Sequence, residues 1–159
     1  MVEAYADVGG NILGVMDIPR EKTGSYGIVD IDKSAHNKDE RLVTAKGLVE
    51  KPAPADAPST LSIIGRYILQ PNVFDILDKQ KPGAGGEIQL TDAISSMIGK
   101  HKNEGVGVHG YRFEGVRYDC GSLVGFVAAN VAYALEREEI SARVTKELKE
   151  VFKRAGIDG

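Results

Sequence analysis

Apolar positions along the chain follow two periods, and together they predict an α/β protein. Short apolar runs bounded by Gly, Pro or Asn are typical of strands, and apolar residues three or four apart are typical of helices. Strands are expected over 12–18, 26–31, 42–51, 61–69, 106–113 and 116–119, and helices over 1–7, 71–80, 91–98, 122–136 and 141–154. Because some strands follow one another directly while others alternate with helices, we expect a mixed sheet with helical layers.

The last two helices differ in how their apolar residues are spread. The helix over 122–136 is apolar almost all round, which predicts that it is buried. The helix over 141–154 carries one apolar stripe, suited to packing or self-association. This stripe consists of Val144, Leu148, Val151 and Phe152. Cys120, just before the first of these helices, is expected to be a small buried hydrophobic residue.

Composition narrows the classes of function. The 159 residues carry a formal net charge of -3, which gives no reason to expect nucleic acid or an anionic membrane as a partner. No apolar run approaches the roughly 20 residues of a membrane span. A single cysteine is typical of a reducing compartment, so we expect a cytoplasmic protein. The chain opens on what reads as the end of a helix, so we expect it to be cut from a longer protein, with sheet edges exposed.

Glu50 and Lys51 stand side by side where an apolar strand ends against Pro52. Neighbours on a strand point to opposite faces, so both reach one ligand only at the tip of the strand. Pro52 is expected to hold Lys51 in extended geometry. A carboxylate accepts hydrogen bonds from sugar hydroxyls and an ammonium binds phosphate, which suits a sugar phosphate. The alternative is a solvated ion pair at a strand end.

Two further segments carry candidate chemistry. The glycine-rich turn over 83–86 offers backbone amides to an anion, or it simply ends a helix. Asp119 is either the N-cap of the following helix or one ligand of Mg²⁺, whose other protein ligand would then come from outside the chain. Thr91 suits the N-cap of the helix that it opens. His36, His101 and His109 share no metal-ligand spacing and are expected to be structural or solvated.

Four segments taken in order resemble the bacterial UTP–glucose-1-phosphate uridylyltransferases, also called UDP-glucose pyrophosphorylases. They are Leu48–Pro52, Ile64–Tyr67, Gly83–Asp92 and Tyr118–Gly121. The resemblance runs from Met1 to about residue 139 and covers only the C-terminal half of such a protein. It implies a three-layer α/β nucleotide-diphospho-sugar transferase-like fold, with a mixed sheet, present as its C-terminal half. On this basis residues 1–137 are the sugar-phosphate-binding half, and 138–159 form a C-terminal helix for packing or oligomerisation.

The resemblance also implies roles for individual residues. Lys51 and Asp119 would be catalytic, Asp119 would bind Mg²⁺, and the substrate would meet Gly27, Glu50, Lys51, Ile64 and Gly65. The implied reaction transfers a uridylyl group from UTP to glucose 1-phosphate, giving UDP-glucose and pyrophosphate, in a homo-oligomer. No phosphate loop of the Gly-x-x-x-x-Gly-Lys or Gly-x-Gly-x-x-Gly kind precedes these segments, so the chain alone is expected to be inactive.

Two other functions stay open at this point. One is a sibling transferase that uses another nucleoside triphosphate or another hexose 1-phosphate. The other is a non-catalytic oligomerisation module built from the same half-fold. The presence of Gly27, Glu50, Lys51 and Asp119 together argues against such a module, which has little reason to keep polar residues there.

Overall fold

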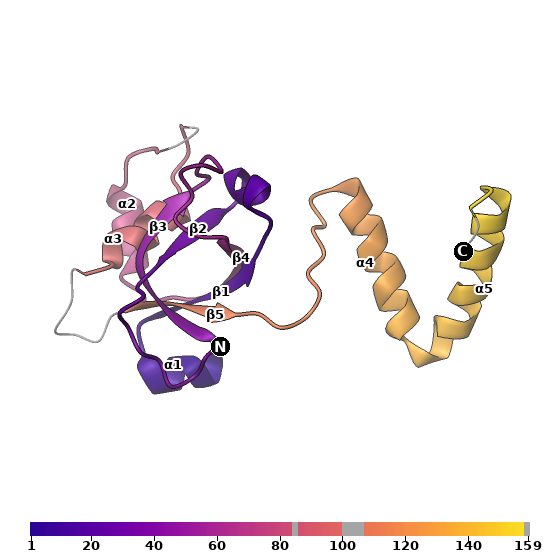
Figure 1. Cartoon of the computed structure of the whole chain (residues 1–159), viewed down its shortest axis with the longest axis horizontal. Coiled ribbons are helices and arrows are strands. Elements are labelled where there is room, and N and C mark those ends of the chain that lie inside the picture. Colours follow the sequence, from indigo (N-terminus) through magenta and orange to yellow (C-terminus); the bar gives the residue numbers. More distant parts are fainter. Residues whose placement is uncertain (84–85, 100–106, 158–159) are drawn as a thin grey trace. The chain divides into compact units, whose positions relative to one another are not determined.

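A computed structural model describes residues 1–83, 86–99 and 107–157, which fall into two compact units, Met1–Glu114 and Gly115–Gly159. The first unit is a mixed α/β structure, as predicted. Its strands are β1 (Asn11–Asp17), β2 (Gly27–Ile31), β3 (Leu42–Glu50), β4 (Leu61–Ile68) and β5 (Val108–Arg112). They close into a barrel in the order β1-β4-β2-β3-β5, in which β1 and β5 are parallel and the other pairs are antiparallel (Figure 1).

Closure of the barrel corrects the expectation of exposed sheet edges. Within the described residues each of the five strands has a neighbour on both sides. The reason is that β5, the last strand, returns to pair with β1 on one side and with β3 on the other. Since pairing of strands far apart in sequence leaves no local signature, the hydrophobic pattern did not reveal it.

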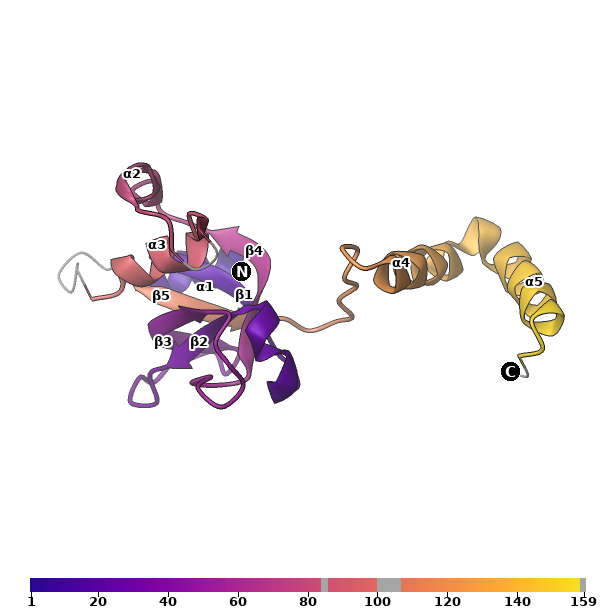
Figure 2. The ribbon, with the colours of Figure 1, turned by 90° about the horizontal axis from the view of Figure 1, so that it is seen from above.

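The helices of the first unit lie on the barrel in a layered order. They are α1 (Val2–Val8), the 3₁₀ helix η1 (Arg20–Ser25), α2 (Val73–Lys79) and α3 (Leu90–Met97). Helix α3 packs on β3, α2 packs on α3, and α1 packs on β1 (Figure 2). The main core lies between α3 and the inner faces of the strands. It is formed by Leu13, Val15, Val29, Ala45, Leu48, Leu61, Ile63, Val73, Ala93, Ile94, Met97 and Val108.

A bulge interrupts β4 at Gly65, inside the strand that the sequence predicted over 61–69. Leu13 pairs with Tyr67 and Val15 pairs with Ile63, so Gly14 faces three residues of β4 rather than one. Gly65 takes a φ of 78°, a left-handed conformation that glycine adopts without a steric penalty. The bulge therefore changes the direction of β4 at the point where its exposed end begins.

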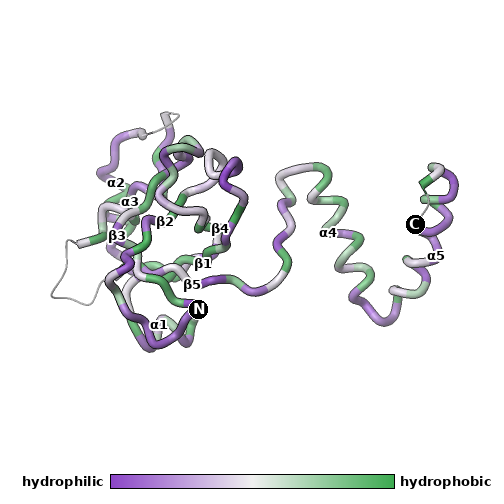
Figure 3. Tube along the Cα trace, in the orientation of Figure 1, coloured by the Kyte–Doolittle hydropathy of each residue, from purple (hydrophilic) through white to green (hydrophobic). Residues whose placement is uncertain are grey.

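The second unit is a pair of helices, α4 (Leu123–Glu136) and α5 (Glu138–Arg154), joined at Arg137. Helix α4 is hydrophobic for most of its length (Figure 3), yet it is not buried as predicted. Leu123 and Val124 are 80% and 81% exposed, and Ala129 is the buried residue of this helix. The prediction fails because, within this unit, only α5 packs against α4, and one neighbour covers only one side of a helix.

Two local expectations in this unit are also wrong. Residues 116–119 form no strand, and Val116 is 71% exposed. Cys120 is exposed rather than buried, because it lies in the turn that leads into α4. The predicted division after residue 137 falls at the junction of α4 and α5, inside this unit. In the part of the chain that the structure describes, no helix is both long and apolar enough to cross a membrane.

Candidate functional site

The end of β3 brings a carboxylate and a hydroxyl to the same stretch of backbone. Glu50 pairs with Gly27 across the β2–β3 ladder. Gly27 is buried, and a Cβ atom built on it would lie 2.8 Å from Oγ1 of Thr91, 3.1 Å from Oε2 of Glu50 and 3.2 Å from Cδ1 of Ile63. These distances are shorter than ordinary contacts, so the glycine at position 27 is what allows a hydroxyl and a carboxylate to face the same stretch of backbone.

Lys51 is not extended, which corrects the expectation drawn from Pro52. It is the one non-glycine residue with positive φ, 46°, among the described residues. Its N–H donates to the carbonyl of Tyr26 at 3.0 Å, and Pro52 is buried, so tertiary contacts override the local preference of a residue before proline. A left-handed conformation costs an ordinary residue roughly 1–2 kcal/mol. Such strain persists where the surrounding structure holds it, and it is common at functional sites.

The two charges at the strand tip differ in their exposure. The Lys51 ammonium lies 3.8 Å from Oε1 of Glu50, with the lysine side chain 50% exposed and the glutamate side chain 12% exposed. No hydrogen bond from a described residue reaches the Glu50 carboxylate. Most buried polar groups have such a partner, and a carboxylate has about four acceptor positions. A solvated ion pair describes Lys51, whereas the Glu50 side chain is mostly enclosed and its carboxylate keeps acceptor positions that a ligand could fill.

Tyr67, on the far side of the bulge in β4, lies within the electrostatic reach of Glu50. Burial, and after it the negative charge of Glu50, raises the pKa of the Tyr67 phenol above its ordinary value of 10.0. The phenol therefore stays protonated at neutral pH and is available as a hydrogen-bond donor.

The connection after Pro52 is held by η1. Nη1 of Arg20 donates to the carbonyls of Pro54 at 2.8 Å and Ala57 at 3.1 Å, and the hydroxyl of the buried Thr23 donates to the Arg20 carbonyl at 2.9 Å. The segment over 52–58, which contains three prolines, is thus tied to η1. This attachment limits how far the Lys51 backbone can relax.

Ile64 and Gly65 lie at the bulge. Gly65 is exposed, with no atom within 4 Å of the position of a Cβ. Ile64 lines a hollow of about 290 Å³ together with Gly14, Arg41 and Arg66. Its neighbour Ile63 is the residue that approaches Gly27. Consecutive strand residues point to opposite faces, which is why Ile63 and Ile64 have different neighbours. The role of Ile64 at the sugar stays a prediction.

Thr91 is a residue of the site whose role the sequence did not reveal. It was expected to cap α3, but the helix begins at Leu90 and its N-cap is Gln89. Thr91 lies in the first turn and is buried. A threonine at a helix start is typical of an N-cap, so the sequence did not indicate another role. The direction of its side chain, toward Gly27, follows from the packing of α3 on β3.

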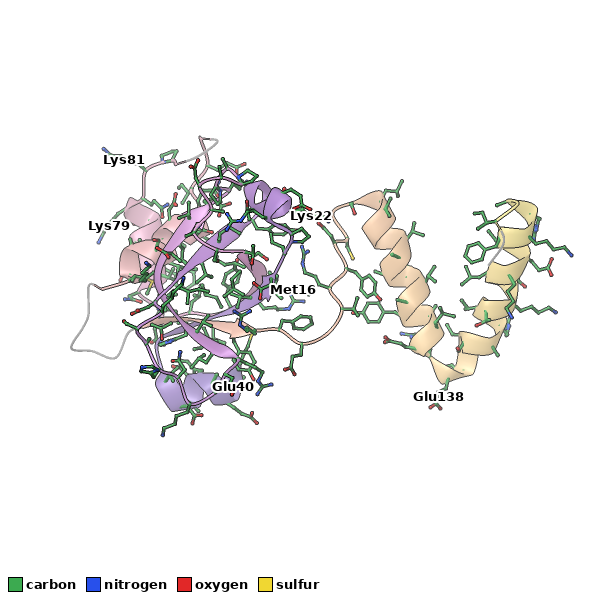
Figure 4. The ribbon with its side chains drawn as sticks, viewed as in Figure 1. Met16, Lys22, Glu40, Lys79, Lys81 and Glu138 are labelled. Atoms are coloured by element: carbon green, nitrogen blue, oxygen red, sulfur yellow. The ribbon has the colours of Figure 1, made fainter. Side chains whose placement is uncertain are left out.

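The glycine-rich turn is described in part, because Ala84 and Gly85 lie outside the described residues, as does His101. The Gly83 amide donates to the Glu87 carbonyl at 2.9 Å, and the Gly86 amide donates to the Gly83 carbonyl at 3.0 Å. These two amides are used within the turn. Lys79 and Lys81, just before it, point away from the barrel (Figure 4).

Asp119 belongs to the second unit and is not the N-cap of α4. The cap is Ser122, whose hydroxyl accepts from the Gly125 amide at 3.0 Å. Oδ1 of Asp119 accepts from the Gly121 amide at 3.1 Å, and its Oδ2 lies 3.8 Å from Nη2 of Arg117. No group of three or more His, Cys, Asp or Glu side chains suited to a metal gathers among the described residues. The exposed Asp119 carboxylate fits a Mg²⁺ ion that takes its remaining ligands from phosphate oxygens and water.

The comparison with family models identifies the class of protein to which this α/β fold belongs. The nucleotidyl transferase model matches residues 1–136, so the chain belongs to that family. The match ends with α4 and does not include α5. The family resemblance and the fold class inferred from the sequence are thereby confirmed.

Individual relatives show which members of the family this chain is similar to. The UTP–glucose-1-phosphate uridylyltransferase of Komagataeibacter xylinus is 55% identical over 124 residues, which are 78% of this chain and 40% of that protein. The enzyme of the same name from Staphylococcus haemolyticus is 42% identical over 151 residues, 95% of this chain and 49% of that protein. A crystal structure of UDP-glucose pyrophosphorylase complexed with UDP-glucose matches with a TM-score of 0.75 and 38% identity, over 86% of this chain and 49% of that one. The chain thus spans about half the length of these relatives.

Proposed function

We propose that this chain supplies the sugar-phosphate side of a UTP–glucose-1-phosphate uridylyltransferase. The observation that carries the proposal is the mostly enclosed Glu50 side chain, whose carboxylate lacks a hydrogen-bond donor among the described residues and lies 3.8 Å from the Lys51 ammonium. An acceptor for hydroxyls beside a cation for phosphate matches the two ends of a hexose 1-phosphate. The names of the relatives support glucose as the hexose and UTP as the nucleotide.

The proposed reaction does not need a strong general base. An oxygen of the glucose 1-phosphate phosphate attacks the α-phosphorus of UTP, a new P–O bond forms, and the bond to pyrophosphate breaks. The nucleophile is already an anion, so the main obstacle is the approach of two negative groups. Lys51 reduces this repulsion at the sugar phosphate, while Glu50 and the Gly27 backbone hold the hexose in place for in-line attack. Asp119 would hold Mg²⁺, whose charge would offset that of the phosphates.

Two further parts of the proposal concern the cellular compartment and the oligomeric state of the protein. We place the protein in the cytoplasm, because its one cysteine is a free, exposed thiol, which is typical of a reducing compartment. We also propose a homo-oligomer, since Leu123 and Val124 present apolar surface on α4. We expect the 159-residue chain to bind glucose 1-phosphate without completing the transfer.

Calorimetric titration of the chain with glucose 1-phosphate tests the proposal. Lys51→Ala and Glu50→Gln should each raise the Kd about 10-fold or more, as expected for hydrogen bonds with a charged partner. Lys46→Ala is the matched control, since Lys46 lies on the same strand, is 58% exposed in its side chain, and pairs with Asp30 at 3.4 Å. Absence of binding by the unaltered chain, or an equal effect of all three substitutions, would contradict the proposal.

A further inference from the structure

The first turn of α3 directs a second polar side chain at the same stretch of backbone as Glu50. Thr91 is 8% exposed. The position that a Cβ of Gly27 would occupy lies 2.8 Å from its Oγ1 and 3.1 Å from Oε2 of Glu50. The two oxygens come from different elements, a helix and a strand, and they flank one spot over a residue that has no side chain.

The hydroxyl of Thr91 has no hydrogen-bond partner in the part of the chain that the structure describes. The residue is mostly enclosed, but its hydroxyl oxygen is not one of the fully buried unpaired atoms, so it remains within reach of a ligand. The neighbouring Glu50 carboxylate also lacks a hydrogen-bond partner among the described residues. A hydroxyl both donates and accepts, whereas a carboxylate only accepts. Both face the same spot over Gly27, so they suit a ligand that carries adjacent hydroxyl groups.

Thr91 is held in this direction by a second contact between the same two elements. Ser95 follows it by one helical turn and so lies on the same face of α3. The Ser95 hydroxyl lies 3.3 Å from both the amide nitrogen and the carbonyl oxygen of Leu48, two residues before Glu50. The helix and the strand tip are therefore fixed relative to each other, and the Thr91 hydroxyl is positioned before any ligand arrives.

We propose that Thr91 is a specificity-determining residue of the hexose site, and that its hydroxyl bonds a sugar hydroxyl next to the one that Glu50 accepts. This inference rests on the proposed function and adds a residue to it. A site built to pair with a sugar hydroxyl loses affinity for an analogue that lacks it, because the buried groups of the site then stay unpaired.

The test is calorimetric titration of the 159-residue chain with glucose 1-phosphate and its 2-, 3-, 4- and 6-deoxy analogues. Thr91→Val keeps the shape of the side chain and removes the hydroxyl, and it should raise the Kd of glucose 1-phosphate about 10-fold, the loss expected for one buried hydrogen bond. One analogue should bind Thr91→Val and the unaltered chain equally, because it lacks the matching hydroxyl. Thr91→Ser should stay within about 3-fold of the unaltered chain, because it keeps the hydroxyl.

Ser96→Ala is the control within the same helix, since the Ser96 hydroxyl donates to the Ala93 carbonyl at 2.8 Å. It should leave every Kd unchanged. If Thr91→Val does not fold, Thr91→Ala repeats the measurement with a smaller side chain. An unchanged Kd, or an equal loss for glucose 1-phosphate and all four analogues, overturns the role of Thr91 and leaves the proposed function standing. A failure of the unaltered chain to bind glucose 1-phosphate overturns the proposed function, and the role of Thr91 with it.

Discussion

The backbone N–H of Lys51 donates to the carbonyl of Tyr26 at 3.0 Å, at a residue whose φ is 46°. This bond follows the last pair of the β2–β3 ladder and holds a strained conformation next to a charged side chain. Glycine adopts positive φ without penalty, so Lys51→Gly should be more stable to urea than Lys51→Ala by about 1 kcal/mol.

The same two substitutions at Lys46 provide the control. Lys46 lies inside β3, where φ is negative, so Lys46→Gly should be less stable than Lys46→Ala by roughly 0.5–1 kcal/mol. If glycine is the worse residue at both positions, the Lys51 backbone stores no strain.

Arg20→Ala should loosen the segment behind the strand tip. It removes the bonds to the carbonyls of Pro54 and Ala57. The expected loss is about 1 kcal/mol of unfolding free energy, together with a rise of roughly 3-fold in the Kd of glucose 1-phosphate, because Lys51 is then less well positioned. Lys22→Ala, an exposed cation of the same 3₁₀ helix, should change neither quantity. A loss of stability with an unchanged Kd would limit Arg20 to a role in the fold.

Gly27→Ala should destabilise the barrel and damage the site together. The new methyl group would meet Thr91 and Glu50 at less than normal contact distance, and overpacking of this kind costs about 1–3 kcal/mol. Gly47→Ala on β3 is the control, because its Cβ would find its nearest atom at 3.6 Å. Combining Gly27→Ala with Thr91→Ala should recover part of the loss, since the two side chains compete for one space. Additive losses in urea unfolding would show that they do not.

The stability of the chain should depend on pH through His109. Burial lowers the pKa of His109 below its ordinary value of 6.5, so between these two pKa values the unfolded chain binds more protons than the folded one. Stability therefore rises with pH through that window and is lost as the pH falls below about 6.5. Urea unfolding from pH 5 to pH 8 should show a shallower slope for His109→Gln. His36→Gln, in an exposed position, should keep the slope of the unaltered chain.

The hydrophobic pattern predicted the strands and α-helices of the first unit, though not the 3₁₀ helix η1, because the periods of strands and helices differ and because glycine and proline mark their ends. It also predicted that Glu50 and Lys51 meet at the end of β3, since consecutive strand residues share a ligand only there. What it missed depends on contacts between distant residues. The left-handed Lys51 is set by Tyr26 and its surroundings, and the direction of Thr91 is set by the packing of α3.

The expected burial of α4 failed for a different reason. An apolar sequence indicates that a helix is favoured in a buried position, but it does not show which neighbouring element covers it. Leu123 and Val124 remain exposed because α5 is the helix that packs on α4 in its unit. The role proposed for Asp119 is likewise not decided by the local sequence pattern, since Mg²⁺ ligands usually come from separate segments and from the substrate.

The pairing of β1 with β5 has a consequence for how the protein forms during synthesis. Asn11 pairs with Val108, so the barrel joins its first strand to its last. Folds that depend on contacts between distant parts of the chain form slowly, because the entropy of loop closure is lost before those contacts form. On the ribosome, β1 through β4 emerge before the strand that seals them. Until β5 emerges, the free edges of β1 and β3 are open to other chains, and chaperone binding is most useful during that interval.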